Sequence, residues 1–240
     1  MNNIIECSNL KKSFHINKRD YEPVLKGIDF TVSTGEFVSI VGPSGSGKST
    51  FLYCLSGLMK ADSGKSTLFS VDLIQSSRKK RSEIRRRNAS FIFQDYNLVD
   101  SMTAWENVQL ALKFISKRRS RRELNELFSE FGLSHRKNYY PAQLSGGQRQ
   151  RVAIIRAIAV KPRVLFADEP TGALDSNSGR LVIDKITELN NQGTSVVMVT
   201  HDLDVASKAH RSVVLRDGRL TNDIKDPSIE RLFDAIGDYK

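Results

Sequence analysis

The stretch that decides the fold is Gly42-Pro43-Ser44-Gly45-Ser46-Gly47-Lys48-Ser49-Thr50. The apolar run before it, residues 37–41, predicts a buried strand. Residues 49–58 after it carry apolar side chains at helical spacing, with Gly57 near the end of the helix. Strand, glycine-rich turn and helix in this order are the context of a phosphate-binding P-loop. The sequence therefore predicts a nucleoside-triphosphate site. A flexible Gly/Ser loop, the alternative, leaves the flanking strand and helix unexplained.

The chemistry of such a loop assigns each part a role. The glycines let the backbone wrap so that its N–H groups point at phosphate oxygens, and the helix N-terminus adds partial positive charge. Lys48 then reaches the β- and γ-phosphates, and the Ser49 hydroxyl can bind Mg²⁺.

Composition limits the remaining possibilities. A chain of 240 residues is long enough for a sizeable core. No apolar run approaches the roughly 18 residues that span a bilayer, and the polar start Met1-Asn2-Asn3 is not a signal peptide. Cys7 and Cys54 form no metal-binding pattern, so we expect two buried, reduced thiols and a cytoplasmic location.

The net charge of +10 is concentrated in two short runs. Residues 78–87 carry seven bases and one acid, and residues 117–122 carry five bases, so the rest of the chain is close to neutral. Such runs are typical of contact with nucleic acid, anionic lipid or an acidic partner, but an ordinary solvated helix face remains an equal alternative.

Polar residues follow three apolar runs that predict strands. Asp168 and Glu169 end the run at 164–167, and adjacent carboxylates there are costly to bury unless they serve a cation or a proton transfer. His201 ends the run at 195–200, where open α/β sheets place their ligands. Gln94 closes the run at 90–93 and either faces the nucleotide or is a plain loop residue.

Two further features have a structural and a functional interpretation. Leu144-Ser145-Gly146-Gly147-Gln148 opens a strong amphipathic helix that continues to Ala159; its glycines offer bare N–H groups to an anion, or Ser145 is simply an N-cap. Phe14 follows the first predicted strand and, taken alone, is more typical of a core residue.

The other elements are predicted from periodicity and turn residues. Strands are expected at 4–10 and 28–32, a short β region at 62–75, and a hairpin over 211–220 turned by Asp217-Gly218. Helices are expected at 103–131, 178–190 and 228–236.

Taken together, the P-loop, residues 144–153, residues 164–169 and Gly172-Ala173-Leu174-Asp175 resemble the ATP-binding subunit of an ABC transporter. The resemblance covers nearly the whole chain, with every motif in family order and at family spacing. Leu-Ser-Gly-Gly-Gln is its diagnostic element.

The resemblance implies a fold of the α/β class: a P-loop NTPase core with a mainly parallel sheet, an N-terminal antiparallel β subdomain and an inserted helical signature subdomain. The whole chain, 1–240, would form one ABC ATPase domain. Residues 1–94 and 160–240 would form the nucleotide-binding core, and residues 95–159 the helical subdomain.

The resemblance also implies a role for each matching position. Phe14 would stack on adenine without the hydroxyl of the usual Tyr, and His201 would contact the γ-phosphate. Asp168 and Ser49 would hold Mg²⁺, Gln94 would sense Mg²⁺ and the attacking water, and Glu169 would be the general base.

Ser145, Gly146, Gly147 and Gln148 would close over the γ-phosphate of a second copy's ATP, with Asp175 in the loop between the two sites. Because a helical subdomain separates this signature from the chain's own P-loop, we expect a head-to-tail dimer around two ATP molecules. Phosphoryl transfer agrees with this arrangement, because it needs positioning and charge neutralisation more than covalent catalysis.

Residues 93–98 followed by 102–108 are similar to the branch that serves lipoprotein release, macrolide-type efflux and antimicrobial-peptide resistance. The expected function is an ATPase on the cytoplasmic face of the membrane that powers a separate permease, with peripheral membrane contact through the basic runs. A soluble ABC ATPase acting on ribosomes or nucleic acid is the alternative. It is disfavoured by the single domain and by the absence of a long coiled-coil insertion.

Overall fold

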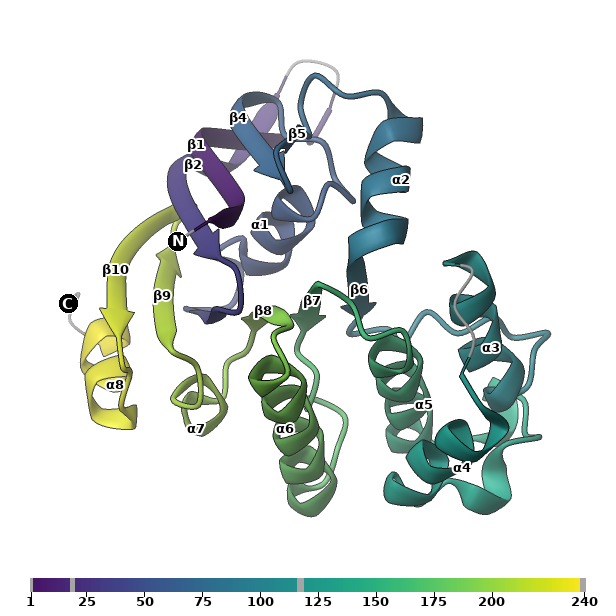
Figure 1. Ribbon diagram of the computed structural model, residues 1–240. Helices are drawn as coiled ribbons and strands as arrows, with labels where there is room; N and C mark the ends of the chain where they lie inside the picture. The colour runs from purple at the N-terminus through teal and green to yellow at the C-terminus, as the bar shows by residue number, and fades with distance from the viewer. Residues whose placement is uncertain (1, 18–19, 116–118, 238–240) are drawn as a thin grey trace. The chain divides into compact units, whose positions relative to one another are not determined.

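The computed structural model describes residues 2–17, 20–115 and 119–237 (Figure 1). Lys117 and Arg118 of the second basic run therefore lie outside the described residues. The chain divides into two compact units, residues 1–85 with 195–240 and residues 86–194. The predicted helical subdomain, 95–159, lies within the second unit, and its bounds stay a prediction.

The first unit contains an antiparallel sheet of strand order β2-β1-β4-β5. Its members are β1 (Asn3–His15), β2 (Tyr21–Ser33), β4 (Ser63–Leu68) and β5 (Val71–Asp72). β1 and β2 are longer than the predicted strands, because bulges between Cys7 and Leu10 and between Lys12 and Ser13 interrupt the alternation that marks a strand in sequence. Phe14 accordingly lies inside β1, not after it.

The same unit contains strands that run in the order β10-β9-β3-β8. They are β3 (Phe37–Val41), β8 (Ser195–Val199), β9 (Arg211–Arg216) and β10 (Arg219–Lys225). β3 pairs in parallel with both β8 and β9, whereas β9 and β10 form the predicted antiparallel hairpin at Asp217-Gly218. Every residue of β3 and β8 is buried, as expected for parallel strands covered on both faces.

Helix α1 (Lys48–Leu55) follows the P-loop and packs on β2 through the rings of Phe30 and Phe51, whose centroids are 5.3 Å apart. It ends before the predicted end at residue 58, because the chain turns at Gly57 with a φ of 69°. The other helices are α2 (Arg78–Asn88), which crosses into the second unit, α7 (Leu203–Ala206) and α8 (Ile229–Gly237).

The second unit pairs β6 (Ala89–Ile92) in parallel with β7 (Val164–Asp168) and is otherwise mostly helical. Its helices are α3 (Ala104–Phe114), α4 (Arg121–Glu130), α5 (Gly146–Ala159), α6 (Ser176–Asn191) and the short turns η1 (Ser134–Arg136) and η2 (Pro141–Gln143). α5 packs against α3, α4 and α6 (Figure 1). The predicted α/β fold, with its antiparallel β subdomain and helical insertion, is confirmed.

Both cysteines are free and buried, as predicted. Burial is the main cause that raises the pKa of the Cys7 thiol and of the Cys54 thiol, each to about 12. Both side chains therefore stay protonated and act as small apolar core residues. Among the described residues, no helix is both long enough and apolar enough to cross a bilayer.

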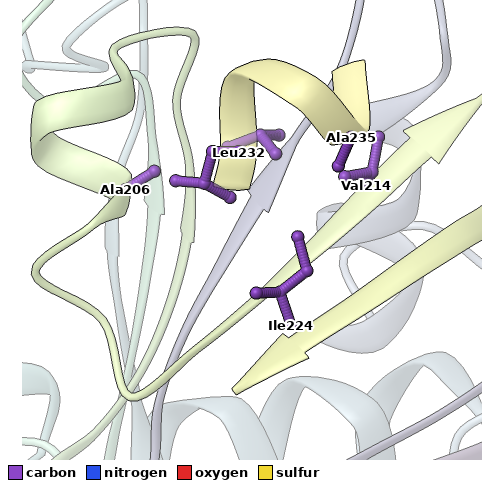
Figure 2. Packing of buried hydrophobic residues seen from close by; sticks show 6 residues of the cluster. Ala206, Val214, Ile224, Leu232 and Ala235 are labelled. Carbon is purple, nitrogen blue, oxygen red and sulfur yellow. The ribbon is translucent and has the colours of Figure 1, made fainter. Parts of the chain in front are cut away.

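The C-terminal helix closes a small hydrophobic cluster beside the P-loop strand. Leu232 and Ala235 of α8 pack with Val214 of β9, Ile224 of β10 and two further buried residues, Val41 and Ala206 (Figure 2). Since Val41 directly precedes the P-loop, this packing supports the strand end from which the loop leaves.

We expect Leu232→Ala to lower the free energy of unfolding by about 2–5 kcal/mol, because the buried leucine leaves a cavity. The adjacent Phe233 is 68% exposed, so Phe233→Ala is the matched control and should change stability by about 0.5 kcal/mol or less. Urea denaturation of both variants measures the difference. Equal destabilisation by the two would contradict the packing of α8.

Candidate active site

The P-loop connects β3 to α1 with a backbone that only glycine fits at two places. Gly42 has a φ of 146°, and a Cβ there would collide with the backbone carbonyl of Leu215 in β9. Gly47, the N-cap of α1, has a φ of 98°, and a Cβ would lie 3.0 Å from the Val24 side chain of β2. The loop is therefore pressed against two neighbouring strands, which fixes its course.

The loop offers hydrogen-bond donors suited to phosphate. The Ser46 N–H donates to the Pro43 carbonyl at 3.3 Å, whereas no acceptor among the described residues takes the backbone N–H of Gly45 or Gly47. The Lys48 ammonium donates to the carbonyls of Gly42 at 2.9 Å and Pro43 at 2.8 Å, which holds this cation over the loop. Backbone donors, a lysine and the start of a helix together form an anion site.

The β9–β10 turn supports this loop, and sequence reasoning missed its role. The Gly218 N–H donates to the Ser46 carbonyl at 3.2 Å, and the Lys26 N–H donates to the Gly218 carbonyl at 2.8 Å. The dipeptide Asp217-Gly218 identifies the turn in sequence, but nothing in sequence indicates that it contacts the P-loop.

His201 lies at the same sheet edge as the P-loop. β8 and β3 are parallel neighbours with Ile40 opposite Val199, and the Thr200 N–H donates to the Ile40 carbonyl at 3.2 Å. His201 follows directly and is exposed. The carboxyl ends of adjacent parallel strands thus carry both the phosphate loop and this imidazole, as the strand-end interpretation expected.

Phe14 is 39% exposed, so the interpretation of this residue as core is wrong. The Lys12 ammonium lies 5.4 Å from the centroid of the Phe14 ring and pairs with the Asp62 carboxylate at 2.6 Å. An exposed aromatic face of this kind suits stacking of a planar base.

The second unit places its carboxylates at the end of β7. Asp168 is the last residue of the strand and is 1% exposed. Glu169 follows with a φ of 50°, a left-handed conformation that is uncommon for glutamate. Its carbonyl accepts from the Gly172 N–H at 3.2 Å. Non-glycine residues in this conformation are concentrated at functional sites.

Gln94 lies at the same edge as these carboxylates. β6 pairs in parallel with β7, with Ile92 opposite Ala167, and Gln94 is an exposed residue two positions beyond the strand end. The parallel pair β6–β7 thus carries Gln94 and Asp168–Glu169 as the pair β3–β8 carries the P-loop and His201.

The signature sequence forms the N-terminus of α5. Ser145 is the N-cap: its hydroxyl accepts from the Gln148 N–H at 3.3 Å, and the Gln148 side chain accepts from the Ser145 N–H at 3.0 Å. The N-cap interpretation is therefore correct. It leaves the helix start at Gly146 and Gly147 available to an anion, so the two interpretations do not exclude each other.

Asp175 is the N-cap of α6. Its carboxylate accepts from the Asn177 N–H at 3.1 Å, the Ser178 N–H at 3.0 Å and the Ser178 hydroxyl at 2.7 Å. These hydrogen bonds, chiefly those from Ser178, hold the pKa of the Asp175 carboxyl below its usual value. The preceding residues, Ala173 and Leu174, lie beside Gly147, so this loop adjoins the signature sequence.

Sequence reasoning missed three polar residues that shape the loops of the second unit. Asn107 of α3 is buried, and its amide donates to three carbonyls of the preceding loop, those of Val99, Met102 and Thr103, at 3.0–3.1 Å. Gln150 and Arg156 of α5 bond to loops after β7 and β6. The feature of the sequence that could have identified these three residues is a polar side chain among the apolar positions of an amphipathic helix.

Comparison with known proteins agrees with this geometry. The sequence profile of the family described as ABC transporter matches residues 25–172. The chain is 41% identical over 222 residues to the uncharacterized ABC transporter ATP-binding protein YvrO of Bacillus subtilis, covering 92% of this chain and 96% of that one.

The chain is also 41% identical over 234 residues to the macrolide export ATP-binding/permease protein MacB of Escherichia coli K12, covering 97% of this chain but only 36% of MacB. Among solved structures, the ATP-binding cassette MJ0796, a dimer in a post-hydrolysis state bound to ADP and Pi, superposes with a TM-score of 0.87 at 37% identity, covering 93% of this chain and 99% of MJ0796.

The matched profile spans more than half of the chain, and relatives at 41% identity align over more than nine-tenths of it. The chain therefore belongs to the ABC transporter family and is an ATP-binding, ATP-hydrolysing subunit of that family.

Proposed function

We propose that this subunit binds ATP with Mg²⁺, dimerises around two ATP molecules and powers a separate membrane permease. Export or extraction of a peptide, lipoprotein or drug-like substrate is the proposed transport task. The observation that carries the proposal is the P-loop at a strand edge that it shares with His201. No acceptor in the described part of the chain takes its Gly45 and Gly47 N–H donors, and Lys48 is held over it.

Each site residue has a proposed role. The P-loop donors and Lys48 neutralise the phosphates, Phe14 stacks on adenine, and His201 contacts the γ-phosphate. Glu169 accepts the proton of the attacking water. The exposure of Phe14 and the unusual backbone of Glu169 support these two assignments.

Mg²⁺ is proposed to bind through the Ser49 hydroxyl, Asp168 and Gln94, together with phosphate oxygens. Among the described residues, no group of three His, Cys, Asp or Glu side chains forms a metal site. Mg²⁺ is usually held by one or two carboxylates plus substrate phosphates. When bound, Mg²⁺ supplies positive charge to the phosphates.

A head-to-tail dimer is proposed from the family resemblance, in which the signature residues Ser145–Gln148 act on a second copy, and the start of α5 at Gly146 and Gly147 is suited to an anion. In that dimer, the start of α5 from one copy would contact the γ-phosphate bound by the other, with Asp175 in the loop between the sites. The dimeric form of the MJ0796 cassette supports the proposal.

The permease partner is proposed to be a separate protein, bound at the cytoplasmic face of the membrane. MacB, by its name, joins an ATP-binding and a permease part in one protein, and this chain matches about a third of its length. The segment after Gln94, with Leu98, Val99, Met102 and Trp105, offers apolar and aromatic side chains for a short permease helix.

We expect Glu169→Gln to lower the ATPase rate by more than about a hundredfold, because the general base is lost, while ATP binding persists. The variant should accumulate as an ATP-bound dimer, which size-exclusion chromatography with and without ATP would detect. Lys48→Ala is the comparison variant, and it should instead lose affinity for ATP. Turnover at the parental rate by Glu169→Gln would remove Glu169 from its proposed role.

The composite site predicts that two inactive variants restore activity when mixed. Lys48→Ala and Ser145→Arg each damage both sites of a homodimer, but a mixed dimer has one intact site. The ATPase rate of the mixture should therefore exceed the average of the separate rates and should be highest near equal amounts. A rate that follows the average at every ratio would contradict a signature that acts in trans.

We also propose that the basic start of α2 contacts anionic lipid near the permease. Arg78, Lys79 and Lys80 are exposed, the first turn contains no acidic residue, and none of the three pairs with a carboxylate of the described residues. Basic residues at a helix N-terminus oppose the helix dipole, so the protein gains nothing from this arrangement by itself. Burial is the main cause that lowers the pKa of Arg85, and the nearby charges of Arg81 and Arg78 lower it further.

Replacing Arg78, Lys79 and Lys80 by Gln should weaken binding to phosphatidylglycerol vesicles by up to about a hundredfold, at about 1 kcal/mol per charge. The effect should fade as salt shortens the Debye length below about 8 Å. Co-sedimentation with phosphatidylglycerol vesicles measures this binding, and phosphatidylcholine vesicles provide the uncharged comparison. Neutralising Lys208, Arg219 and Lys225, three exposed cations elsewhere, is the control. If the Arg78, Lys79 and Lys80 variant loses binding to RNA but keeps binding to vesicles, the result would favour the nucleic-acid alternative.

A further inference from the structure

Arg156, near the end of α5, holds the segment that follows Gln94. Its guanidinium donates to the Tyr96 carbonyl at 2.8 Å and to the Asn97 carbonyl. Burial lowers the pKa of Arg156 to about 10, and no carboxylate of the described residues pairs with it. Arg156 is partly buried, and withdrawing a guanidinium from water is costly unless its donors are satisfied, so the two carbonyls compensate for that cost.

The two carbonyls belong to consecutive residues in an unfavourable conformation. Tyr96 has a φ of 62° and Asn97 a φ of 47°, whereas residues other than glycine rarely adopt the left-handed region, and then as single residues. A bidentate contact from a planar guanidinium fits this pair, because its N–H groups lie in a fixed fork. The contact therefore compensates for the backbone conformation two and three residues beyond Gln94.

The start of α5 touches the same segment. A Cβ on Gly146 would lie 3.3 Å from the Tyr96 hydroxyl, and the Arg149 guanidinium lies 5.6 Å from the centroid of the Tyr96 ring. The signature helix thus contacts the Gln94 segment at both its first and its last turn.

The same helix also holds the loop of the general base. Gln150 is 1% exposed, and its side-chain amide donates to the Pro170 carbonyl at 2.9 Å. Pro170 follows Glu169, the other residue of this site with a left-handed backbone. Two side chains of one helix therefore fix the segments that carry Gln94 and Glu169.

We propose that Arg156 is a positioning residue for ATP hydrolysis: it holds residues 96–97 in their left-handed course and fixes the Gln94 segment to the signature helix. Gln150 provides the equivalent contact for the Glu169 loop. Neither side chain needs to touch ATP. The proposal rests on the roles proposed above for Gln94 and Glu169.

The first test is Arg156→Lys, which keeps the charge but replaces the planar fork with a single ammonium. We expect kcat to fall about tenfold or more, because Gln94 loses its fixed position, while the KM for ATP changes by less than about threefold. Hydrogen exchange of residues 94–99 should accelerate. Arg119→Lys is the control, since Arg119 also donates to a backbone carbonyl, that of Ala159 at 2.7 Å. Arg119 pairs with Glu123 as well, and within the described residues it bonds to neither loop.

A second variant separates positioning from general stability. Asn97→Gly added to Arg156→Lys should restore at least part of kcat, because glycine adopts a φ of 47° without cost and no longer needs the guanidinium. Asn97→Ile with Arg156 intact should lower kcat, because a β-branched residue strongly disfavours this φ. Asn97 is exposed, so this variant tests the proposal even if Arg156→Lys fails to fold.

The proposal is overturned if Arg156→Lys retains kcat within about twofold, or if Asn97→Gly restores nothing and Asn97→Ile has no effect. These outcomes differ from failure of the proposed catalytic roles, which the Glu169→Gln measurement reports separately. An active parental chain with an inactive Glu169→Gln variant, combined with an unaffected Arg156→Lys variant, refutes only the positioning role.

Discussion

The structure depends on one backbone constraint, the passage of the chain from β3 into α1 at Gly42. That residue has a φ of 146° and lies against the Leu215 carbonyl, where no side chain fits. Contacts with the neighbouring strands fix the loop at this end and at Gly47, and the Lys48 ammonium is held by the carbonyls of Gly42 and Pro43. Donors whose positions are fixed in this way are the condition for strong electrostatic stabilisation of developing charge.

The candidate site residues all follow the carboxyl ends of parallel strands. In the first unit, the P-loop and His201 follow the adjacent parallel strands β3 and β8. In the second unit, Gln94 and Asp168–Glu169 follow the adjacent parallel strands β6 and β7. Within each pair, parallel strands place these two ends at the same edge and keep apolar residues buried. The rigid part is thus the strand, and the reactive part is the residue immediately after it.

Three of the non-glycine residues with a left-handed backbone lie in segments that the signature helix supports. They are Tyr96, Asn97 and Glu169, and each lies in or next to a segment held by a polar side chain of α5. The signature helix therefore has two functions in this chain. Its capped N-terminus presents Gly146 and Gly147, and two of its polar residues, the buried Gln150 and the partly buried Arg156, shape the loops around it.

The sequence by itself determined the P-loop, the buried strands with their terminal Gln94, Asp168 and His201, the capped signature helix and the β9–β10 turn. Each of these depends on residues close together in the chain, and local periodicity or turn chemistry identifies them. Only the tertiary structure decided the full length of β1 and β2 and the exposure of Phe14. It alone also showed that Gly218 supports Ser46. The contacts of Arg156 with Tyr96 and Asn97, and of Gln150 with Pro170, belong to the same group. These features join residues far apart in sequence, or depend on bulges that hide the alternation of a strand, so no local pattern contains them.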